Sequence, residues 1–165
     1  MSFELLHFRD SEKILKKLQM MQDVTKTLEY LDTVLYESTN KGELLKYALK
    51  DMGWREDGTL NILEHRRYQH KGFKNKVAIE GYIGTFENLE GIFRLQVAFD
   101  KQKIETGILL MNSLRSFDSP FGSSSELVEW EIEQLEPTIF MPVSVALFDL
   151  GRVDVEPELK ESISG

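Results

Sequence analysis

The segment KGFKNKVAIEGYIGTFENLEGIFRLQVAFDKQKIETGILLM, residues 71–111, decides the fold expected for this chain. It contains an apolar run at residues 76–83, an amphipathic stretch that begins near Thr85, and a second apolar run at residues 104–111. A strand, a helix and a strand within about forty residues is the span of a βαβ unit. The segment therefore predicts two parallel strands joined by a helix.

Glu80 is the unusual residue of the first of these strands, because all its close neighbours in VAIEGY are apolar or small. A carboxylate in a buried strand costs several kcal/mol unless it is paired, hydrogen-bonded or bound to a metal. The residues alone leave three interpretations open. Glu80 could bind a metal, form a salt bridge with a neighbour such as Lys76 or Arg94, or lie at a strand position that faces solvent.

The sequence before this segment predicts mainly helices. Apolar residues recur at helical spacing from Ser11 to about residue 38, with a break at residues 23–25, and a second amphipathic helix ends at Gly53. Apolar and polar residues then alternate at residues 59–68, which predicts a strand ahead of the central segment.

The sequence after it predicts one more helix and one more strand. The stretch DSPFGSSS at residues 118–125 is typical of a loop, and Ser124 or Ser125 can cap the helix that follows. A last buried strand is expected within residues 139–150. The chain is thus expected to be an α/β protein with a mixed central sheet flanked by helices.

Length and composition favour one folded domain. The chain has 165 residues, of which 41% are hydrophobic and 29% are charged, as is usual for globular proteins. We expect an N-terminal helical part at residues 1–54, an α/β core at residues 55–152 and a flexible acidic tail at residues 153–165.

Several classes of function are disfavoured by what the sequence lacks. Without cysteine it has no disulfide, no thiolate nucleophile and no cysteine zinc site. It has neither a phosphate-binding glycine loop nor a nucleophile elbow, and His7, His65 and His70 lack metal-ligand spacing. We therefore expect no organic cofactor. No signal peptide is recognisable and no apolar run approaches the roughly 18 residues that span a membrane, so a cytoplasmic protein without a membrane partner is expected.

Charge is distributed unevenly along the chain. The net charge of −8 disfavours non-specific binding of nucleic acids. Residues 65–76, HRRYQHKGFKNK, nevertheless carry several cations and no acid, whereas acids collect at residues 126–136. This basic segment is either a local anion-binding face or a solvated, charged hairpin. His65 and His70 are read most simply as exposed polar residues of a turn.

Carboxylates are the groups left to carry chemistry. Glu80 lies in the buried strand and Glu64 lies on the strand expected before it. Mg²⁺ needs only one or two carboxylates when water and phosphate oxygens complete its coordination. Metal-assisted phosphodiester hydrolysis would use such a sparse set of residues.

The sequence pieces KNKVAIEGYI, FRLQVAFDKQKI and ETGILLM, with the later MPV, resemble the catalytic core of the BglII/BstYI-type restriction endonucleases of the PD-(D/E)XK nuclease superfamily. The resemblance extends over residues 28–152. It implies a restriction-endonuclease-like core, Mg²⁺ as cofactor, duplex DNA as substrate and a homodimeric assembly.

The catalytic motif of this family is only partly present. Glu80 matches the family's strand glutamate, which would make it the metal ligand. The family's aspartate is replaced by Lys71, with His70 beside it, and its third position, a Lys, Glu or Gln, is replaced by Tyr82. Either Glu64 has taken over from the aspartate as the second catalytic carboxylate, or the chain no longer cleaves DNA.

The resemblance thus predicts a restriction-endonuclease-like DNA-binding protein, with Mg²⁺-dependent hydrolysis if the catalytic set is complete. The alternative is a catalytically inactive protein of the same fold that acts through protein–protein interaction. The residues expected to contact DNA are Arg66, Arg67, His70, Lys71, Lys74 and Lys76.

Overall fold

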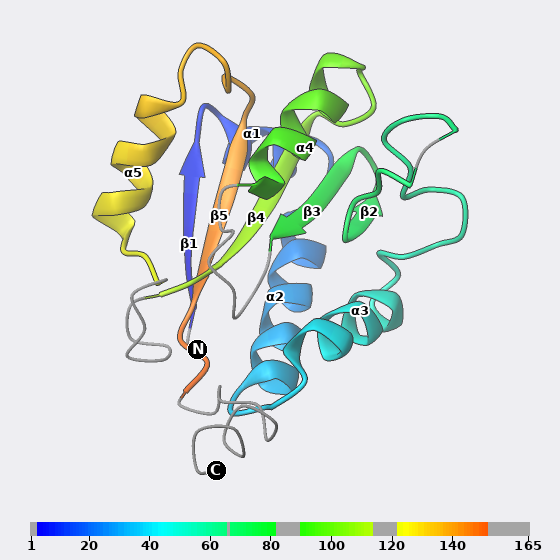
Figure 1. Ribbon diagram of the computed structural model, residues 1–165, viewed down its shortest axis with the longest axis vertical. Coiled ribbons are helices and arrows are strands. Elements are labelled where there is room, and N and C mark those ends of the chain that lie inside the picture. The colour runs from blue at the N-terminus through cyan, green and yellow to red at the C-terminus, as the bar shows by residue number, and fades with distance from the viewer. Residues whose placement is uncertain (1–2, 66, 82–89, 114–121, 152–165) are drawn as a thin grey trace, which may run out of the picture.

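A mixed five-stranded sheet forms the centre of the computed structural model, which describes residues 3–65, 67–81, 90–113 and 122–151 (Figure 1). The strand order is β1-β5-β4-β3-β2, in which β3, β4 and β5 are parallel and the two edge strands are antiparallel to their neighbours. The strands are β1 (Phe3–Phe8), β2 (Gly72–Lys74), β3 (Val77–Gly81), β4 (Thr106–Asn112) and β5 (Val143–Phe148).

Helices cover both faces of the sheet (Figure 1). One apolar cluster joins one face to the first three helices, and a second cluster joins the opposite face to the last two. The first group is α1 (Ser11–Lys17), α2 (Met21–Leu35) and α3 (Lys41–Asp51), and the second is α4 (Glu90–Asp100) and α5 (Ser125–Gln134).

Strand β3 illustrates how the sequence produces this two-layered core. Val77 and Ile79 pack into the cluster of α1–α3, whereas Ala78 between them packs into the cluster of α4 and α5. Successive side chains of a strand point to opposite faces, so a strand covered on both sides must be apolar throughout. Glu80 breaks this rule, although it too is buried.

The expected βαβ unit is present as β3, α4 and β4, with β3 and β4 paired in parallel. The cap of the later helix is also confirmed, since the Ser124 hydroxyl accepts a hydrogen bond from the backbone N–H of Leu127 at 3.3 Å. The last strand, β5, lies within the range expected for it.

The strand expected at residues 59–68 is wrong. The described residues of this region form a loop with an isolated bridge between Asn61 and Gln69, and the strand that pairs with β3 on the side away from β4 is the short β2. Its apolar alternation was misleading because Ile62 packs into the cluster of α4 and α5 from a loop, which the bond from the Ile62 N–H to the Tyr68 carbonyl closes.

Two features near the N-terminus also differ from the expectation. The long helix is interrupted at Gln19, which has a φ of 58°, and not at residues 23–25, which lie within α2. The first strand, β1, has no counterpart in the expected element order. It joins the central sheet at its edge, where Leu5 pairs with Ala146 of β5.

Some expectations fall on residues outside the described ranges: the helix start near Thr85, the motif position Tyr82, the cation Arg66, the acidic tail and the first half of the loop at residues 118–125. None of the helices described here combines the length and apolar character needed to cross a membrane.

Candidate functional site

Glu80 is buried where α4 crosses β3, with 1% of its surface exposed. Gly91 allows this close approach of the helix. A Cβ atom at Gly91 would lie 2.9 Å from the Cβ of Glu80 and 3.1 Å from the backbone nitrogen of Gly81. The carboxylate is therefore enclosed between the sheet and α4, and it is not a strand position that faces solvent.

The partner of Glu80 is His70. The His70 Nδ1 atom lies 2.6 Å from the Glu80 Oε2 atom, and only 4% of His70 is exposed. The backbone of this segment is fixed on both sides, because the His70 N–H donates to the Leu60 carbonyl and the Lys71 N–H to the Ile79 carbonyl. His70 is thus not an exposed turn residue, and the salt bridge of Glu80 is formed with neither Lys76 nor Arg94.

The environment of Glu80 acts on its pKa in opposite directions. Burial raises the pKa above the usual range of a glutamate, because the charged form loses its hydration. The hydrogen bond and charge of His70 lower it, as do the charges of Arg94 and Lys71. Burial is the larger effect, and the pKa of Glu80 remains raised.

Lys71 adds a partly buried amine to this pair. Burial lowers the pKa of Lys71, and the nearby charge of Lys46 lowers it further, whereas the charge of Glu80 raises it. The Arg55 side chain donates to the Lys71 carbonyl at 2.6 Å and holds the backbone at this position. A carboxylate, an imidazole and an amine therefore interact at the β2 edge of the sheet.

The predicted basic segment is divided by the fold. Arg67 and Lys76 are exposed, while His70 is buried. The Lys74 amine lies 2.6 Å from the Asp23 carboxylate and donates to the Met52 carbonyl at 3.2 Å. Lys74 therefore joins the hairpin to α2 and α3, and Arg67 and Lys76 are the exposed cations of the segment among the described residues.

The described residues do not fit a magnesium site. Glu64 is exposed in a turn, whereas Glu80 is enclosed and bonded to His70. Nowhere in the described ranges do three or more histidine, aspartate or glutamate residues lie together in a way that could hold a metal. Among the described residues Glu80 is thus a single enclosed carboxylate whose Oε2 atom is already bonded to His70, which is a poor ligand set for Mg²⁺.

The pairing of His70 with Glu80 was missed by sequence reasoning, because it depends on the turn between β2 and β3. Asn75 and Lys76 both have positive φ angles, 46° and 67°, as a two-residue hairpin turn of type I′ requires. Such a turn fixes the register of β2 against β3, with Gly72 opposite Ile79. The next residues outward, Lys71 and His70, then flank Glu80.

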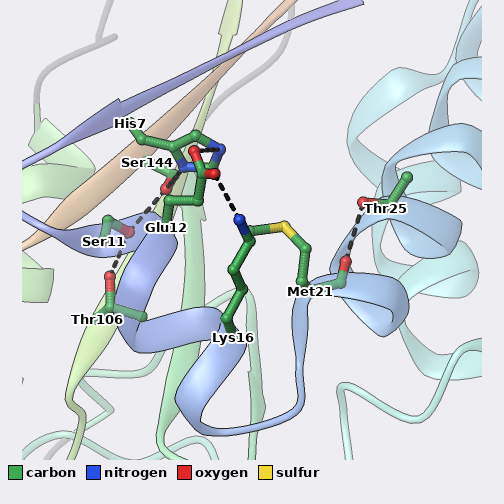
Figure 2. Close-up of polar contacts among 8 residues, drawn as sticks. All are labelled: His7, Ser11, Glu12, Lys16, Met21, Thr25, Thr106 and Ser144. Carbon is green, nitrogen blue, oxygen red and sulfur yellow. Dashed lines mark hydrogen bonds and ion pairs between the residues drawn. The ribbon is translucent and has the colours of Figure 1, made fainter.

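A second group of polar side chains lies on the opposite face of the sheet, beneath α1 (Figure 2). The Ser144 hydroxyl lies 2.6 Å from His7 Nδ1 and 2.7 Å from the Ser11 hydroxyl, which is in turn 2.6 Å from that of Thr106. The order Glu12, His7, Ser144 resembles a catalytic triad, with 3.6 Å between Glu12 and His7. Ser144 is fully buried and its oxygen is already bonded to two partners, so the group satisfies polar atoms in the core.

Comparisons with known proteins identify the fold. No protein-family model matches the sequence, and no curated protein matches it either. Among solved structures, the crystal structure of free BglII matches with a TM-score of 0.58 and 12% identity, over 90% of this chain and 79% of that one. The restriction endonuclease BglII complexed with a DNA 16-mer matches with a TM-score of 0.64 and 15% identity, over 90% and 76% of the two chains.

The chain has a BglII-type fold. The expected fold class, a restriction-endonuclease-like mixed sheet flanked by helices, is thereby confirmed. At 12–15% identity the BglII likeness concerns the path of the backbone. The chemistry of this chain has to be argued from its own side chains.

Proposed function

We propose that this protein binds duplex DNA through the exposed cations of the segment at residues 65–76. The observation that carries the proposal is the similarity of the fold to BglII in complex with a DNA 16-mer. The exposure of Arg67 and Lys76 supports it further, in a segment without acidic residues on a chain of net charge −8. Exposed cations can neutralise phosphates and position a duplex.

Reversing both exposed charges tests DNA binding. For the double variant Arg67→Glu and Lys76→Glu we expect the affinity for a duplex to fall by about 10- to 100-fold near 0.1 M salt. The slope of log K against log salt should decrease by about 2, because two phosphate contacts are lost. Fluorescence anisotropy with a labelled duplex at several salt concentrations measures both quantities.

The matched control reverses two exposed lysines on other elements, Lys13→Glu in α1 and Lys26→Glu in α2. It changes the net charge as much as the test variant does, so it separates the local contact from the overall field. DNA binding through the hairpin is wrong if both double variants lose the same affinity, or if the wild-type protein binds no duplex.

We infer that DNA binding by this protein does not lead to Mg²⁺-dependent cleavage through Glu80. The inference is supported by the pairing of Glu80 with His70 and by the separation of exposed Glu64 from the enclosed carboxylate. Lys71 stands at the position where the resemblance to the endonuclease family places an aspartate, and its charged ammonium form repels a metal cation. Loss of one member of a cooperating catalytic set costs orders of magnitude in rate.

A plasmid assay tests this inference. We expect supercoiled plasmid to stay intact with the wild-type protein in Mg²⁺ and in Mn²⁺, with no difference from the Glu80→Gln variant. Nicking by the wild-type protein that Glu80→Gln abolishes would overturn the inference and restore Glu80 as a catalytic metal ligand. A parallel Glu64→Gln variant would then show whether Glu64 is the second carboxylate.

A second candidate function is protein binding, which the outer surface of α5 favours. Leu127 and Trp130 lie three residues apart on one side of this helix and are 43% and 58% exposed. Aromatic residues are enriched in protein interfaces, and a second copy of this chain is the partner to test first. Sedimentation of the wild type and of Trp130→Asp decides this, because a dimer formed through α5 should dissociate in the variant.

A further inference from the structure

A cavity of about 300 Å³ lies at the edge of the sheet, at the end opposite to the carboxyl ends of β3 and β4. Its wall comes from three places: Asn61 in the loop before β2, Phe73 and Lys76 in the β2–β3 hairpin, and Gln102 and Lys103 in the turn between α4 and β4. Cavities that bind small molecules begin at about this size. The three segments are far apart in sequence, and the fold brings them to one place.

The cavity is positively charged. Lys76 and Lys103 line it, and none of the residues described in its wall is acidic. The Lys103 amine is held in place, because it donates to the Ile62 carbonyl at 2.7 Å. An ammonium group has three N–H bonds, so Lys103 keeps two further donors on a fixed position.

Uncharged groups of the wall complete a donor-rich site. The Asn61 Oδ1 atom accepts a hydrogen bond from Gln69 at 2.8 Å, which leaves the amide N–H bonds of Asn61 as donors. Gln102 contributes a second carboxamide, and the Phe73 ring supplies an apolar surface on which a base or sugar can pack. His70 also borders the cavity, with its ring fixed by Glu80.

We propose that this cavity binds a phosphomonoester of mononucleotide size, with its phosphate held by Lys103 and Lys76 and its organic part placed against Phe73. Ammonium groups and amide donors around an anion form charge-assisted hydrogen bonds, which are stronger than neutral ones. Two lysines and no acidic side chain in the described wall favour an anion over a cation as the ligand of this cavity. The cavity shares Lys76 with the proposed duplex contact, but Lys103, Gln102 and Asn61 have no part in that contact, so variants at these residues separate the two proposals.

Binding is measured by calorimetric titration of the full chain with deoxyadenosine monophosphate, with deoxyadenosine and with inorganic phosphate. We expect the monophosphate to bind saturably and the nucleoside not to bind. Lys103→Ala should weaken binding about 10- to 100-fold, through loss of a charge-assisted bond. Lys101→Ala, at an exposed lysine two residues away that does not line the cavity, should change binding less than about twofold.

A second variant guards against a structural effect of Lys103→Ala on the loop at Ile62. Gln102 has a φ of 60°, so Gln102→Gly removes the carboxamide at a position where glycine is favoured. We expect this variant to melt no lower than the wild type and to bind the monophosphate about threefold or more weakly.

The proposal is overturned if no monophosphate binds saturably, if deoxyadenosine binds as well as its monophosphate, or if Lys101→Ala has the same effect as Lys103→Ala. It is also overturned if Gln102→Gly and Lys103→Ala weaken duplex DNA binding as much as monophosphate binding, since the cavity would then belong to the duplex surface. A 5′-phosphorylated oligonucleotide compared with its 5′-hydroxyl form distinguishes a nucleic-acid end from a free nucleotide as the source of the phosphate. Weaker duplex binding in the single variant Arg67→Glu, with monophosphate binding retained, supports both proposals, because Arg67 does not line the cavity.

Discussion

His70→Ala is expected to lower the free energy of unfolding by about 3 kcal/mol at pH 8. The substitution leaves the Glu80 carboxylate enclosed between β3 and α4 without its 2.6 Å partner. Removing one member of a buried pair is costly mainly because the remaining group is desolvated and unpaired. Urea denaturation of the wild type and the variant measures the difference.

The effect should depend on pH. The pKa of Glu80 is higher in the folded protein than in the unfolded chain. The contribution of Glu80 to stability is therefore complete below the pKa of the unfolded chain. It is lost as the pH rises through the pKa of the folded protein. His70 lowers the pKa of Glu80, so in His70→Ala the pKa rises further. The loss of stability should therefore be smaller at pH 5 than at pH 8, because a lower pH favours protonation of the unpaired carboxyl group.

Two further variants define the origin of the effect. His65 is exposed with a φ of 63°, and His65→Asn, which suits that conformation, should change stability by less than about 0.5 kcal/mol. The double variant His70→Ala and Glu80→Ala should lose less than the sum of the two single variants, because each single variant leaves an unpaired partner and the double variant leaves none. Additive losses, or a His70→Ala variant as stable as the wild type, would show that the contact does not stabilise the fold.

The central part of the fold was predictable because its elements carry strong local patterns. Three elements are recognisable from a few residues each: the apolar strand around Ile79, the amphipathic helix after it, and the apolar strand β4. A helix between two strands implies that the strands are parallel. Strand β1 carries no such pattern. It is an edge strand of mixed composition, and it is defined by its pairing with β5, which is distant in sequence and pairs Leu5 with Ala146.

One member of the site, Glu80, was predictable from the local sequence, whereas its partner was not. Glu80 could be recognised as unusual, since a carboxylate buried among apolar residues is stable only with a partner. The identity of that partner depends on the register of a hairpin, and the short strand β2 gives too few residues to reveal it by alternation. The positive φ angles of Asn75 and Lys76, which set the register, can only be suspected from the residue types.

Gly81→Ala is expected to be the most damaging single methyl addition near the site, with a loss of about 3–5 kcal/mol or failure to fold. Gly81 has a φ of 122°, and a Cβ atom there would lie 2.2 Å from the carbonyl oxygen of Leu110 in β4. The clash is with backbone, so no change of rotamer relieves it. Differential scanning calorimetry and the yield of folded protein measure the effect.

Two other glycines provide a graded comparison for this substitution. Gly91→Ala would bring its Cβ atom within 2.9 Å of the Glu80 side chain, so α4 must move outward, at a cost of about 1–3 kcal/mol. Gly42→Ala in α3 meets no atom within 4 Å and should stabilise the protein by about 0.5–1 kcal/mol. The order Gly81, Gly91, Gly42 follows from how closely each backbone approaches its neighbour. If Gly91→Ala proved harmless, α4 would not be packed tightly against β3, and Glu80 would be open to water and to ligands from that side.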